Sequence, residues 1–468
     1  MSRYSLIKSA SWYTVSKILV MSLNFVSIPV FTHLLTTSEY GEVSVYTIWI
    51  GILTPFIGLG LHLSISRAKI EFESNYIQYV SSIIAFLGLL FFLFLFLFFI
   101  FKEQFFSVTK IPSKLALLLF TQVLMCLFIS VSLGMFQFEY KYKLVSILNL
   151  LRAVLSVSFS FVLVLVFNDG MRVEGKIIGV FVVDVILGLS LASYILFKGK
   201  VFFDYKYWKF GLVYSVPFIF GSLSYILNSQ FDRLLINEYV GSSETGIYSF
   251  AYSIGMLLLL LAIAVKQALN PWIYDRLNND DFYPVKSVYV QYIHIFSIVS
   301  MLLLYVTPEL VMLLSDKAFW SGAKILPWIV LGAYLQVLIL NESETQMFLK
   351  KTATNSLIIV LGAVINIILN YFYIPDYGAL GAAITTVITY LVMFLLVFYV
   401  NLKIFKFSLV KVKCYAISIF YVCFFSVVFF YIQDYFILRL GVFLLNSVIL
   451  LRFLLGERNK FISSKASV

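Results

Sequence analysis

The sequence predicts an all-α polytopic membrane protein with about 14 transmembrane helices: two six-helix lobes related by an internal repeat, plus two C-terminal helices. Of 468 residues, 62% are hydrophobic, 18% aromatic and only 12% charged, whereas soluble chains carry about 25% charged residues. The mean hydropathy is +0.98, and apolar runs long enough to cross a bilayer recur along the whole chain. This composition excludes a row of soluble domains, because so much apolar surface could not be hidden from water.

Each predicted span has about 20 apolar residues in a helix, because lipid offers the backbone no hydrogen-bond partners. The run 83–101 has no polar side chain at all. Other spans contain Pro29, Pro55, Pro217 or Pro327, as helices that line a cavity do when their neighbours satisfy the freed carbonyls. The predicted spans are residues 11–33, 43–64, 79–101, 114–136, 144–167, 175–197, 209–231, 246–268, 287–307, 325–347, 354–374, 378–400, 413–431 and 435–455.

The lysines and arginines orient these spans. If the N-terminus is cytoplasmic, 23 of the 34 basic residues lie on the cytoplasmic side and 9 on the opposite side. Cytoplasmic loops of membrane proteins carry this excess, so both termini are predicted to be cytoplasmic. Only the loop with Lys102, Lys110 and Lys114 opposes the trend. The same bias accounts for the net charge of +11, because a basic face lies beside anionic lipid, and no nucleic-acid partner is expected.

Two pairs of short segments indicate an internal repeat. GEVSV at 41–45 leads into the second span, and GIYSF at 246–250 leads into the eighth, 205 residues later. VEG at 173–175 and ALG at 379–381 open the sixth and twelfth spans, 206 residues apart. Both offsets equal six spans, so we expect two parallel lobes, a common arrangement in secondary transporters. The predicted N-lobe is 1–200, the C-lobe 201–405, and residues 406–468 hold the last two spans and a cytoplasmic tail.

Three stretches carry a family resemblance. They are IPVFTHLLTTSEYG at 28–41, FDRLLINEYVGSSETGIYSF at 231–250 and PDYGALGAAITT at 375–386. In this order they resemble the Wzx-type O-antigen and polysaccharide flippases, in the polysaccharide exporter branch of the multidrug/oligosaccharidyl-lipid/polysaccharide exporter superfamily. The sequence departs from the family at His33, where arginine is common, so a fixed charge is not expected there.

The resemblance implies a transporter rather than an enzyme. Its cargo would be an undecaprenyl-diphosphate-linked oligosaccharide repeat unit, moved from the cytoplasmic to the periplasmic leaflet by alternating access. The product would be an envelope polysaccharide such as the O-antigen of lipopolysaccharide, or a capsule. The location would be the bacterial inner membrane, with a polysaccharide polymerase and a chain-length regulator as possible partners.

Ionisable groups inside spans are costly, so each is a functional candidate. In the N-lobe, Lys17 lies inside the first span with Asn24 one heptad further on, and either binds the diphosphate or extends its ammonium to the interface. Arg152 in the fifth span and Asp184 in the sixth lie on helices joined by a short turn, so we expect them to approach. They form a structural ion pair or a switchable one, in which Arg152 binds phosphate and Asp184 couples to an ion or proton.

The C-lobe supplies the other candidates, each with an ordinary alternative as a helix-end or packing residue. Candidates for diphosphate or sugar binding are Arg233, Lys266, Gln267 and Asn270. Candidates for a gate are Asp232, Glu342 and Glu344. Histidine ordinarily titrates near neutral pH, so His294 in the ninth span and, in the N-lobe, His62 in the second span are candidates for ion or proton coupling. A few of the 31 tyrosines and 48 phenylalanines are expected to stack on sugars.

Other functions fit the residues less well. GMRVEGKI at 170–177 approximates a phosphate-binding loop but lacks the Ser/Thr for Mg²⁺ and a strand before it, so no ATPase, metal or other cofactor is expected. Energy would come from a proton or sodium gradient, the membrane potential or consumption of product. Cys126, Cys414 and Cys423 have no metal-site spacing. A multidrug/cation antiporter of the same fold remains the alternative, and a polysaccharide polymerase is less consistent because no long loop is present.

Overall fold

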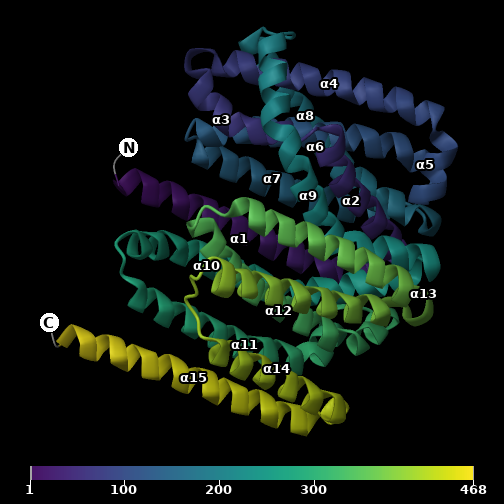
Figure 1. The fold of residues 1–468 in the computed structure, drawn as a ribbon. Coiled ribbons are helices and arrows are strands. Elements are labelled where there is room, and N and C mark those ends of the chain that lie inside the picture. The colour runs from purple at the N-terminus through teal and green to yellow at the C-terminus, as the bar shows by residue number, and fades with distance from the viewer. Residues whose placement is uncertain (1–2, 467–468) are drawn as a thin grey trace. The chain divides into compact units, whose positions relative to one another are not determined.

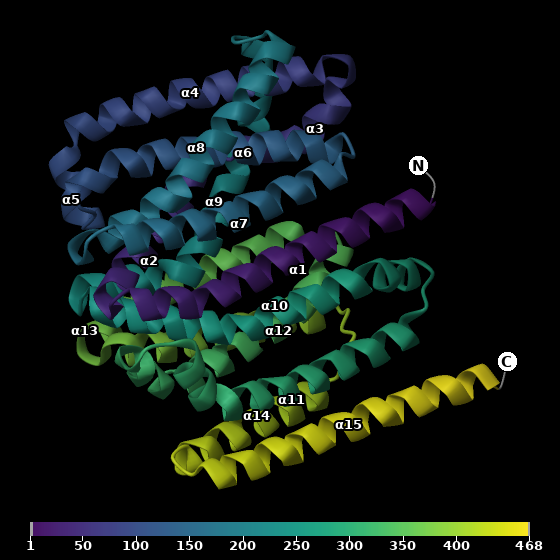
Figure 2. The same ribbon diagram turned by 180° about the vertical axis from the view of Figure 1, so that it is seen from behind.

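The computed structural model of the chain describes residues 3–466, and within them all side chains except those of residues 3–11, 13, 14, 169, 220 and 456–466. All the regular structure in that range is helical (Figures 1 and 2). The chain forms two compact units, one up to Gly246 and the other from Ile247 onward. The predicted all-α class is confirmed.

The helices of the first unit carry short 3₁₀ segments between them. In order they are α1 (Arg3–Leu34), α2 (Thr37–Ile57), η1 (Leu61–Leu63), α3 (Ser64–Glu71), η2 (Glu73–Asn75), α4 (Tyr76–Ile100), α5 (Lys102–Thr109), α6 (Ser113–Phe138), α7 (Tyr142–Val166), η3 (Asp169–Met171), α8 (Arg172–Gly199) and α9 (Tyr205–Tyr239).

The second unit takes all but the first residues of α10 (Ser242–Asn278). It continues with α11 (Phe282–Leu314), η4 (Lys317–Lys324), α12 (Leu326–Phe348), α13 (Thr352–Tyr399), the π-helical η5 (Val400–Ile404), α14 (Val412–Ile432) and α15 (Phe436–Ala466).

The number of spans follows from two irregular places in these helices. Twelve helices of the described range are long and apolar enough to cross a membrane. In addition, α2 and the segment Leu61–Glu71 pass that test together, bent by 66°, so the predicted second span is a broken one. The 48 residues of α13 would extend about 72 Å, far more than the roughly 30 Å hydrocarbon core. The described range thus has twelve candidate spans, or thirteen with the bent pair, and the break at Gly378 divides α13 where the two spans 354–374 and 378–400 are predicted.

The break in α13 depends on glycine. Gly378 has φ 53° and ψ −136°, a conformation that a side chain strongly disfavours. Gly378→Ala is therefore expected to destabilise the protein by on the order of 1 kcal/mol, measured as a lower midpoint of thermal unfolding in detergent. Gly441→Ala is the control, since nothing lies within 4 Å of a Cβ added at Gly441. Equal midpoints for the two variants would contradict the strain at the break.

In the first unit α8 is the central helix. It packs against α4, α6 and α7, and Figures 1 and 2 show these four helices side by side with α9 crossing them. The buried interior is apolar, with Leu87, Val123 and Ile195 fully enclosed. Packing of this kind fixes the depth at which polar residues on neighbouring helices can meet.

Two glycines one turn apart bring α8 close to α7. Gly175 and Gly179 form a G-x-x-x-G pattern, which lets helix backbones approach in membranes. A Cβ at Gly175 would lie 2.9 Å from the Leu163 carbonyl oxygen, and one at Gly179 would overlap the backbone of Ser160. The Ser160 hydroxyl also donates to the Lys176 carbonyl at 2.9 Å, which joins the two helices across this contact.

In the second unit α11 packs against α12, α14 and α15. Arg439 of α15 makes two bonds to Glu309 of α11, Nη1 to Oε2 at 2.8 Å and Nη2 to Oε1 at 2.7 Å. A bidentate pair of this kind fixes both position and orientation. It therefore holds α15 against α11.

The predicted lobes differ from the compact units in the placement of one helix. α9, the seventh span, falls in the predicted C-lobe, yet it packs against α2 and α4 of the first unit. The predicted lobes are defined by the internal sequence repeat, whereas the units are defined by packing. The units therefore do not test the lobe boundaries, which stay a prediction.

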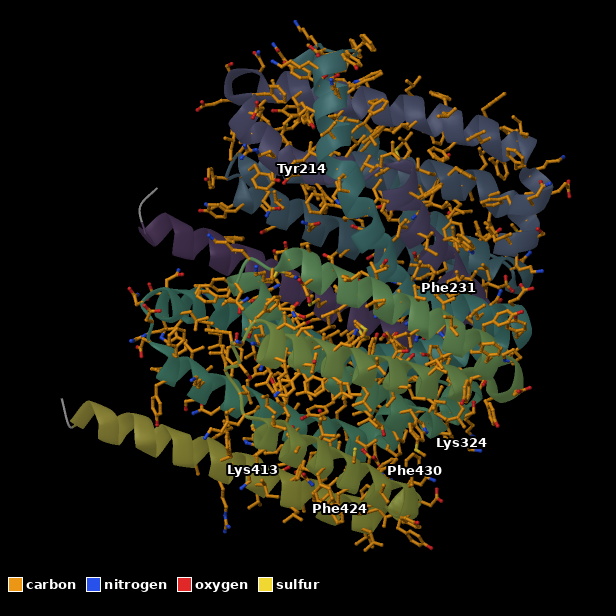
Figure 3. The ribbon with its side chains drawn as sticks, in the orientation of Figure 1. Tyr214, Phe231, Lys324, Lys413, Phe424 and Phe430 are labelled. Carbon is orange, nitrogen blue, oxygen red and sulfur yellow. The ribbon has the colours of Figure 1, made fainter. Side chains whose placement is uncertain are left out.

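Apolar side chains are exposed over long stretches of the described surface. Phe424 and Phe430 on α14, labelled in Figure 3, are examples. A soluble protein rarely shows apolar patches of this extent, whereas lipid solvates them. The chain is a multi-pass membrane protein.

Candidate functional site

Arg152 and Asp184 form the predicted ion pair in the first unit. Arg152 Nε on α7 donates to Asp184 Oδ1 on α8 at 2.6 Å. The Asp184 side chain is 1% exposed, while that of Arg152 is 31% exposed. The predicted approach of the two residues is confirmed; their roles stay predictions.

Two further helices complete this network. Gln122 Nε2 on α6 donates to Asp184 Oδ2 at 3.0 Å, and Tyr46 on α2 donates its hydroxyl to Gln122 Oε1 at 3.0 Å. Cys126 lies between them, accepting from Arg152 Nη2 at 3.4 Å. Asp184 is thus an acceptor satisfied from two sides, whereas the partly exposed guanidinium retains N–H donors for an anionic group.

Lys17 and Asn24 lie apart from this network. Both side chains are exposed on α1, and their spacing of seven residues places them on one face of the helix. That helix packs along α7, where Ser16 Oγ donates to Ser146 Oγ at 3.1 Å. The structure therefore leaves both residues accessible but does not join them to Arg152.

Lys266 is the centre of a second polar cluster, in the other unit. The residue is 3% exposed, and its ammonium donates to Asn341 Oδ1 at 2.7 Å. It also lies 4.0 Å from the ring centroid of Tyr289 and 4.8 Å from that of Tyr292, both on α11. The alternative of Lys266 as a helix-end residue is wrong, because α10 continues to Asn278 and neighbouring helices enclose the residue.

Glu342 of α12 belongs to the same cluster. It is 1% exposed, and its carboxylate accepts from Asn401 Nδ2 at 2.7 Å and from the Tyr415 hydroxyl. The view of this residue as a solvated helix end is therefore wrong, since α14 and η5 cover it. Glu344 lies nearer the surface, bonded at Oε1 to Asn270 Nδ2 at 3.1 Å.

The remaining predicted residues are placed separately. Gln267 is exposed, so it faces away from its neighbour Lys266. Asp232 and Arg233 lie inside α9, seven and six residues before its end, and not at the end as expected. His62 lies in η1 at the break of the second span. His294 lies 3.6 Å from the sulfur of Cys414.

Several members of both networks carried no usable signal in the sequence. Gln122, Cys126, Asn401 and Tyr415 are neutral side chains, and only their position inside apolar runs distinguishes them. Tyrosine is too frequent in this chain for one residue to stand out.

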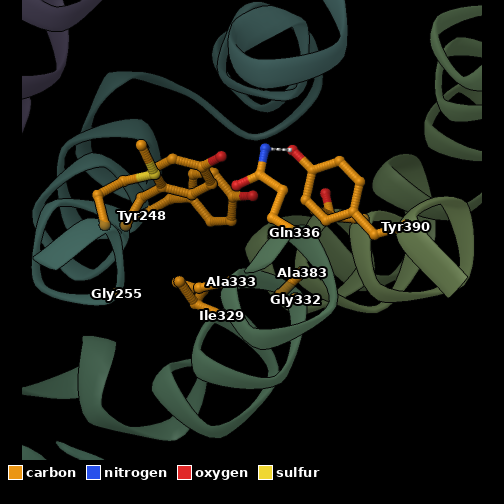
Figure 4. Close-up of a pocket in the computed structure, with 11 residues that line it drawn as sticks. Tyr248, Gly255, Ile329, Gly332, Ala333, Gln336, Ala383 and Tyr390 are labelled. Atoms are coloured by element: carbon orange, nitrogen blue, oxygen red, sulfur yellow. Dashed lines mark hydrogen bonds between the residues drawn. The ribbon is translucent and has the colours of Figure 1, made fainter. Parts of the chain in front are cut away.

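Figure 4 shows a hollow between α10, α12 and α13, walled by Tyr248, Tyr252 and Tyr390. Gln336 Nε2 donates to the Tyr390 hydroxyl at 2.9 Å across it. Tyrosine rings and an amide are suitable partners for sugars, but the free volume of about 10 Å³ holds only one water. A sugar ring does not fit in this conformation.

Comparison with known families decides the membership. A profile described as "Polysaccharide biosynthesis protein" matches residues 6–275, more than half of the chain. The chain belongs to this polysaccharide biosynthesis protein family. A second profile, MatE, matches residues 217–372.

Two curated relatives are similar to the chain at low sequence identity. An uncharacterized membrane protein of Haemophilus influenzae is 23% identical over 415 residues, covering 83% of this chain and 92% of the relative. One of Methanocaldococcus jannaschii is 28% identical over 196 residues, covering 42% and 46%.

Solved structures share the fold. The lipid II flippase MurJ, in an inward closed conformation, superposes with a TM-score of 0.75 at 17% identity, covering 95% of this chain and 99% of that one. A multidrug resistance MATE transporter of the MOP superfamily, facing inward, gives 0.63 at 14% identity, covering 81% and 93%. The fold and both profiles place the chain in the MOP exporter superfamily, the multidrug/oligosaccharidyl-lipid/polysaccharide exporters.

Proposed function

We propose that this protein is a Wzx-type flippase. It translocates an undecaprenyl-diphosphate-linked oligosaccharide from the cytoplasmic to the periplasmic leaflet of the bacterial inner membrane, with both termini cytoplasmic. The observation that carries the proposal is the polysaccharide biosynthesis profile over residues 6–275. The fold shared with a lipid II flippase supports it, as do the many candidate membrane spans of the described residues.

Arg152 is the proposed contact for the diphosphate in the first unit. Its guanidinium is partly exposed while its partner Asp184 is buried, so it offers donors to a ligand without leaving the carboxylate unpaired. Guanidinium matches phosphate geometry well. Lys17 and Asn24 are exposed in the same unit and are proposed as further headgroup contacts. Arg233, which lies on α9 in the first unit, and Lys266, Gln267 and Asn270 in the second unit keep their proposed role in diphosphate or sugar binding.

Energy coupling and partners extend this proposal. Asp184, His62 and His294 are the proposed groups for coupling to a proton or sodium gradient, and Asp232, Glu342 and Glu344 the proposed gate. A polymerase and a chain-length regulator of O-antigen or capsule synthesis are the proposed partners, because flipped repeat units must be consumed on the far side.

A multidrug antiporter is the second candidate. The MatE profile at residues 217–372 favours it, as does the fold shared with MATE transporters. Against it, the buried Asp184 already has Arg152 as its cationic partner at 2.6 Å, which removes the most enclosed carboxylate of the first unit as a site for a cationic drug.

A gene deletion in the host separates the two candidates. A flippase deletion is expected to accumulate lipid-linked oligosaccharide in the membrane and to lose surface polysaccharide, both restored by the wild-type chain. Arg152→Ala is expected to restore less than a tenth of the surface polysaccharide, since a charged contact is worth roughly 1.5–3 kcal/mol. Lys200→Ala, an exposed lysine after α8, is the control and should restore it fully.

Membrane abundance of each variant is measured in parallel, so that loss of protein is separated from loss of transport. Normal lipid-linked intermediates together with raised sensitivity to cationic drugs would replace the flippase by the antiporter.

A further inference from the structure

Five buried polar residues meet in the second unit, where the last turns of α12 lie beside α10 and the first turn of α14. Lys413, labelled in Figure 3, lies at the start of α14. Lys266, Asn341, Glu342, Asn401 and Tyr415 are each at most 3% exposed. They come from α10, α12, η5 and α14, and we call them the Glu342 cluster. Burying a lysine and a glutamate among membrane helices costs free energy, so the Glu342 cluster is a candidate functional site.

The charged members of the Glu342 cluster are joined through neutral groups. Lys266 Nζ donates to Asn341 Oδ1 at 2.7 Å, and Asn341 Nδ2 donates to the Tyr415 hydroxyl at 3.2 Å. That hydroxyl in turn donates to Glu342 Oε1. All three hydrogen bonds donate in the direction from the lysine to the glutamate, so each bond polarises the next. The positive charge of Lys266 therefore stabilises the carboxylate although the two groups are not in contact.

Asn401 fits Glu342 in both of its protonation states. Its Nδ2 donates to Glu342 Oε2 at 2.7 Å, which suits a carboxylate that only accepts. Its Oδ1 is buried and has no recorded partner. A protonated carboxyl carries one O–H donor and requires an acceptor, and turning the amide over presents one. The same residue therefore serves the ionised and the protonated form.

The face of α12 that carries Glu342 has further unsatisfied polar atoms. Thr345 and Gln346 follow it by three and four residues, which places them on the same face. Both are fully buried, and Thr345 Oγ1 and both polar atoms of the Gln346 amide have no recorded hydrogen bond. Buried groups of this kind are normally satisfied, often by water. Internal water beside Glu342 would supply a route for protons.

Asn401 lies in a π-helical turn, Val400–Ile404, in which Phe405 N–H bonds to the Val400 carbonyl at 2.9 Å. Such turns occur often at functional sites. Asn401 Nδ2 also donates to the Glu342 backbone carbonyl at 3.0 Å. The irregular turn is thus attached to α12 through both the carboxyl group and the backbone carbonyl of Glu342, so a change in the carboxyl group alters the connection between α12 and the turn that follows α13.

The other polar groups around Glu342 are accounted for element by element. α10 contributes Lys266 and, further on, Asn270 and Tyr274, both bonded to Glu344. α11 contributes the rings of Tyr289 and Tyr292 beneath the lysine. α13 contributes the neutral Asn355, bonded to Ser343. Among the described residues, Lys266 is the one cation that these contacts place in the Glu342 cluster.

We propose that Glu342 is a proton-binding site of this protein, with Lys266 as its fixed counter-charge. In the ionised state the carboxylate accepts from Tyr415 and Asn401. Uptake of one proton converts it to a carboxylic acid, which donates one bond to Asn401 Oδ1 and loses one acceptor position. Turning the amide over replaces the bond from Asn401 Nδ2 to the carboxylate and also withdraws Nδ2 from the Glu342 backbone carbonyl, so both contacts between the π-turn and α12 change. The proton is released when these two bonds reform. Proton binding is a property of Glu342 beyond the gate role proposed above. It does not depend on which molecule the protein transports.

Infrared difference spectroscopy of the purified protein tests this proposal. On acidification the wild type is expected to gain a carboxylic-acid C=O band that is absent from Glu342→Gln and present in Glu344→Gln. Glu344 is the matched control because it lies two residues away on the same helix and is more exposed. Identical spectra for wild type and Glu342→Gln would overturn the proposal.

A second variant covers the case in which Glu342→Gln does not fold. Tyr415→Phe keeps the carboxyl but removes one donor, so the pH midpoint of the band should shift by about one unit, as loss of a charged hydrogen bond implies. An unchanged midpoint would overturn the role of the Tyr415 bond and with it the proposed site. The spectra need no transported molecule, so this result stands independently of the flippase proposal.

Discussion

Asp184→Ala is expected to lower the free energy of unfolding by about 3 kcal/mol. The substitution removes the acceptor of Arg152 Nε at 2.6 Å and of Gln122 Nε2 at 3.0 Å. Both donors then lie among apolar helices without a replacement. The value is at the lower end of the range for broken buried pairs, because the Arg152 side chain is 31% exposed and water reaches part of it. Denaturant unfolding in detergent micelles measures the effect.

The double variant Arg152→Met with Asp184→Leu is the control for this prediction. Replacing both charges by apolar groups removes the uncompensated ion, and buried pairs replaced in this way are often neutral in stability. We expect most of the lost free energy of unfolding to return, while transport stays impaired. A double variant as unstable as Asp184→Ala would show that packing, and not the unpaired charge, sets the cost.

Gly179→Ala is expected to destabilise the first unit by about 2 kcal/mol, because overpacked helices must separate. The added Cβ would overlap the backbone nitrogen and Cα of Ser160 on α7, which cannot turn away as a side chain does. Gly88→Ala on α4 is the matched control, with nothing within 4 Å of its added Cβ, and should be neutral or slightly stabilising. The midpoint of thermal unfolding measures both, and equal midpoints would contradict the close approach of α7 and α8.

Hydropathy predicts most of this fold because every span must be an apolar helix of about 20 residues to cross the lipid. The division of α13 near Gly378 follows from the length of the apolar run and from Pro375. The meeting of Arg152 and Asp184 follows from the short turn between α7 and α8. Hydropathy does not report where a helix ends, only where the membrane crossing ends. α10 continues to Asn278 beyond its apolar run, and this is why Lys266 was expected at a helix end and lies in an interior.

The site residues that could not be predicted from the sequence are those that lie on helices far along the chain from their partners. Tyr415 is 73 residues from Glu342 and Asn401 is 59 residues away. Their contact depends on how α14 and η5 fold back over α12, and no local periodicity encodes that return. The break of the second span was also missed. The break depends on Leu59 and Gly60, which both have positive φ. The apolar composition of residues 43–64 predicts one continuous helix and does not indicate the break.

The π-helical turn has a consequence for how this chain tolerates insertions and deletions. A π-turn accommodates one residue more than an α-helical turn, so the direction in which Asn401 points depends on residue count as well as on side-chain chemistry. Loss of one residue between Leu396 and Asn401 would rotate the amide by about 100° around the helix axis and withdraw it from Glu342. A one-residue deletion in this plain apolar segment would therefore act like a substitution of Asn401 itself, although every side chain of the cluster would be kept.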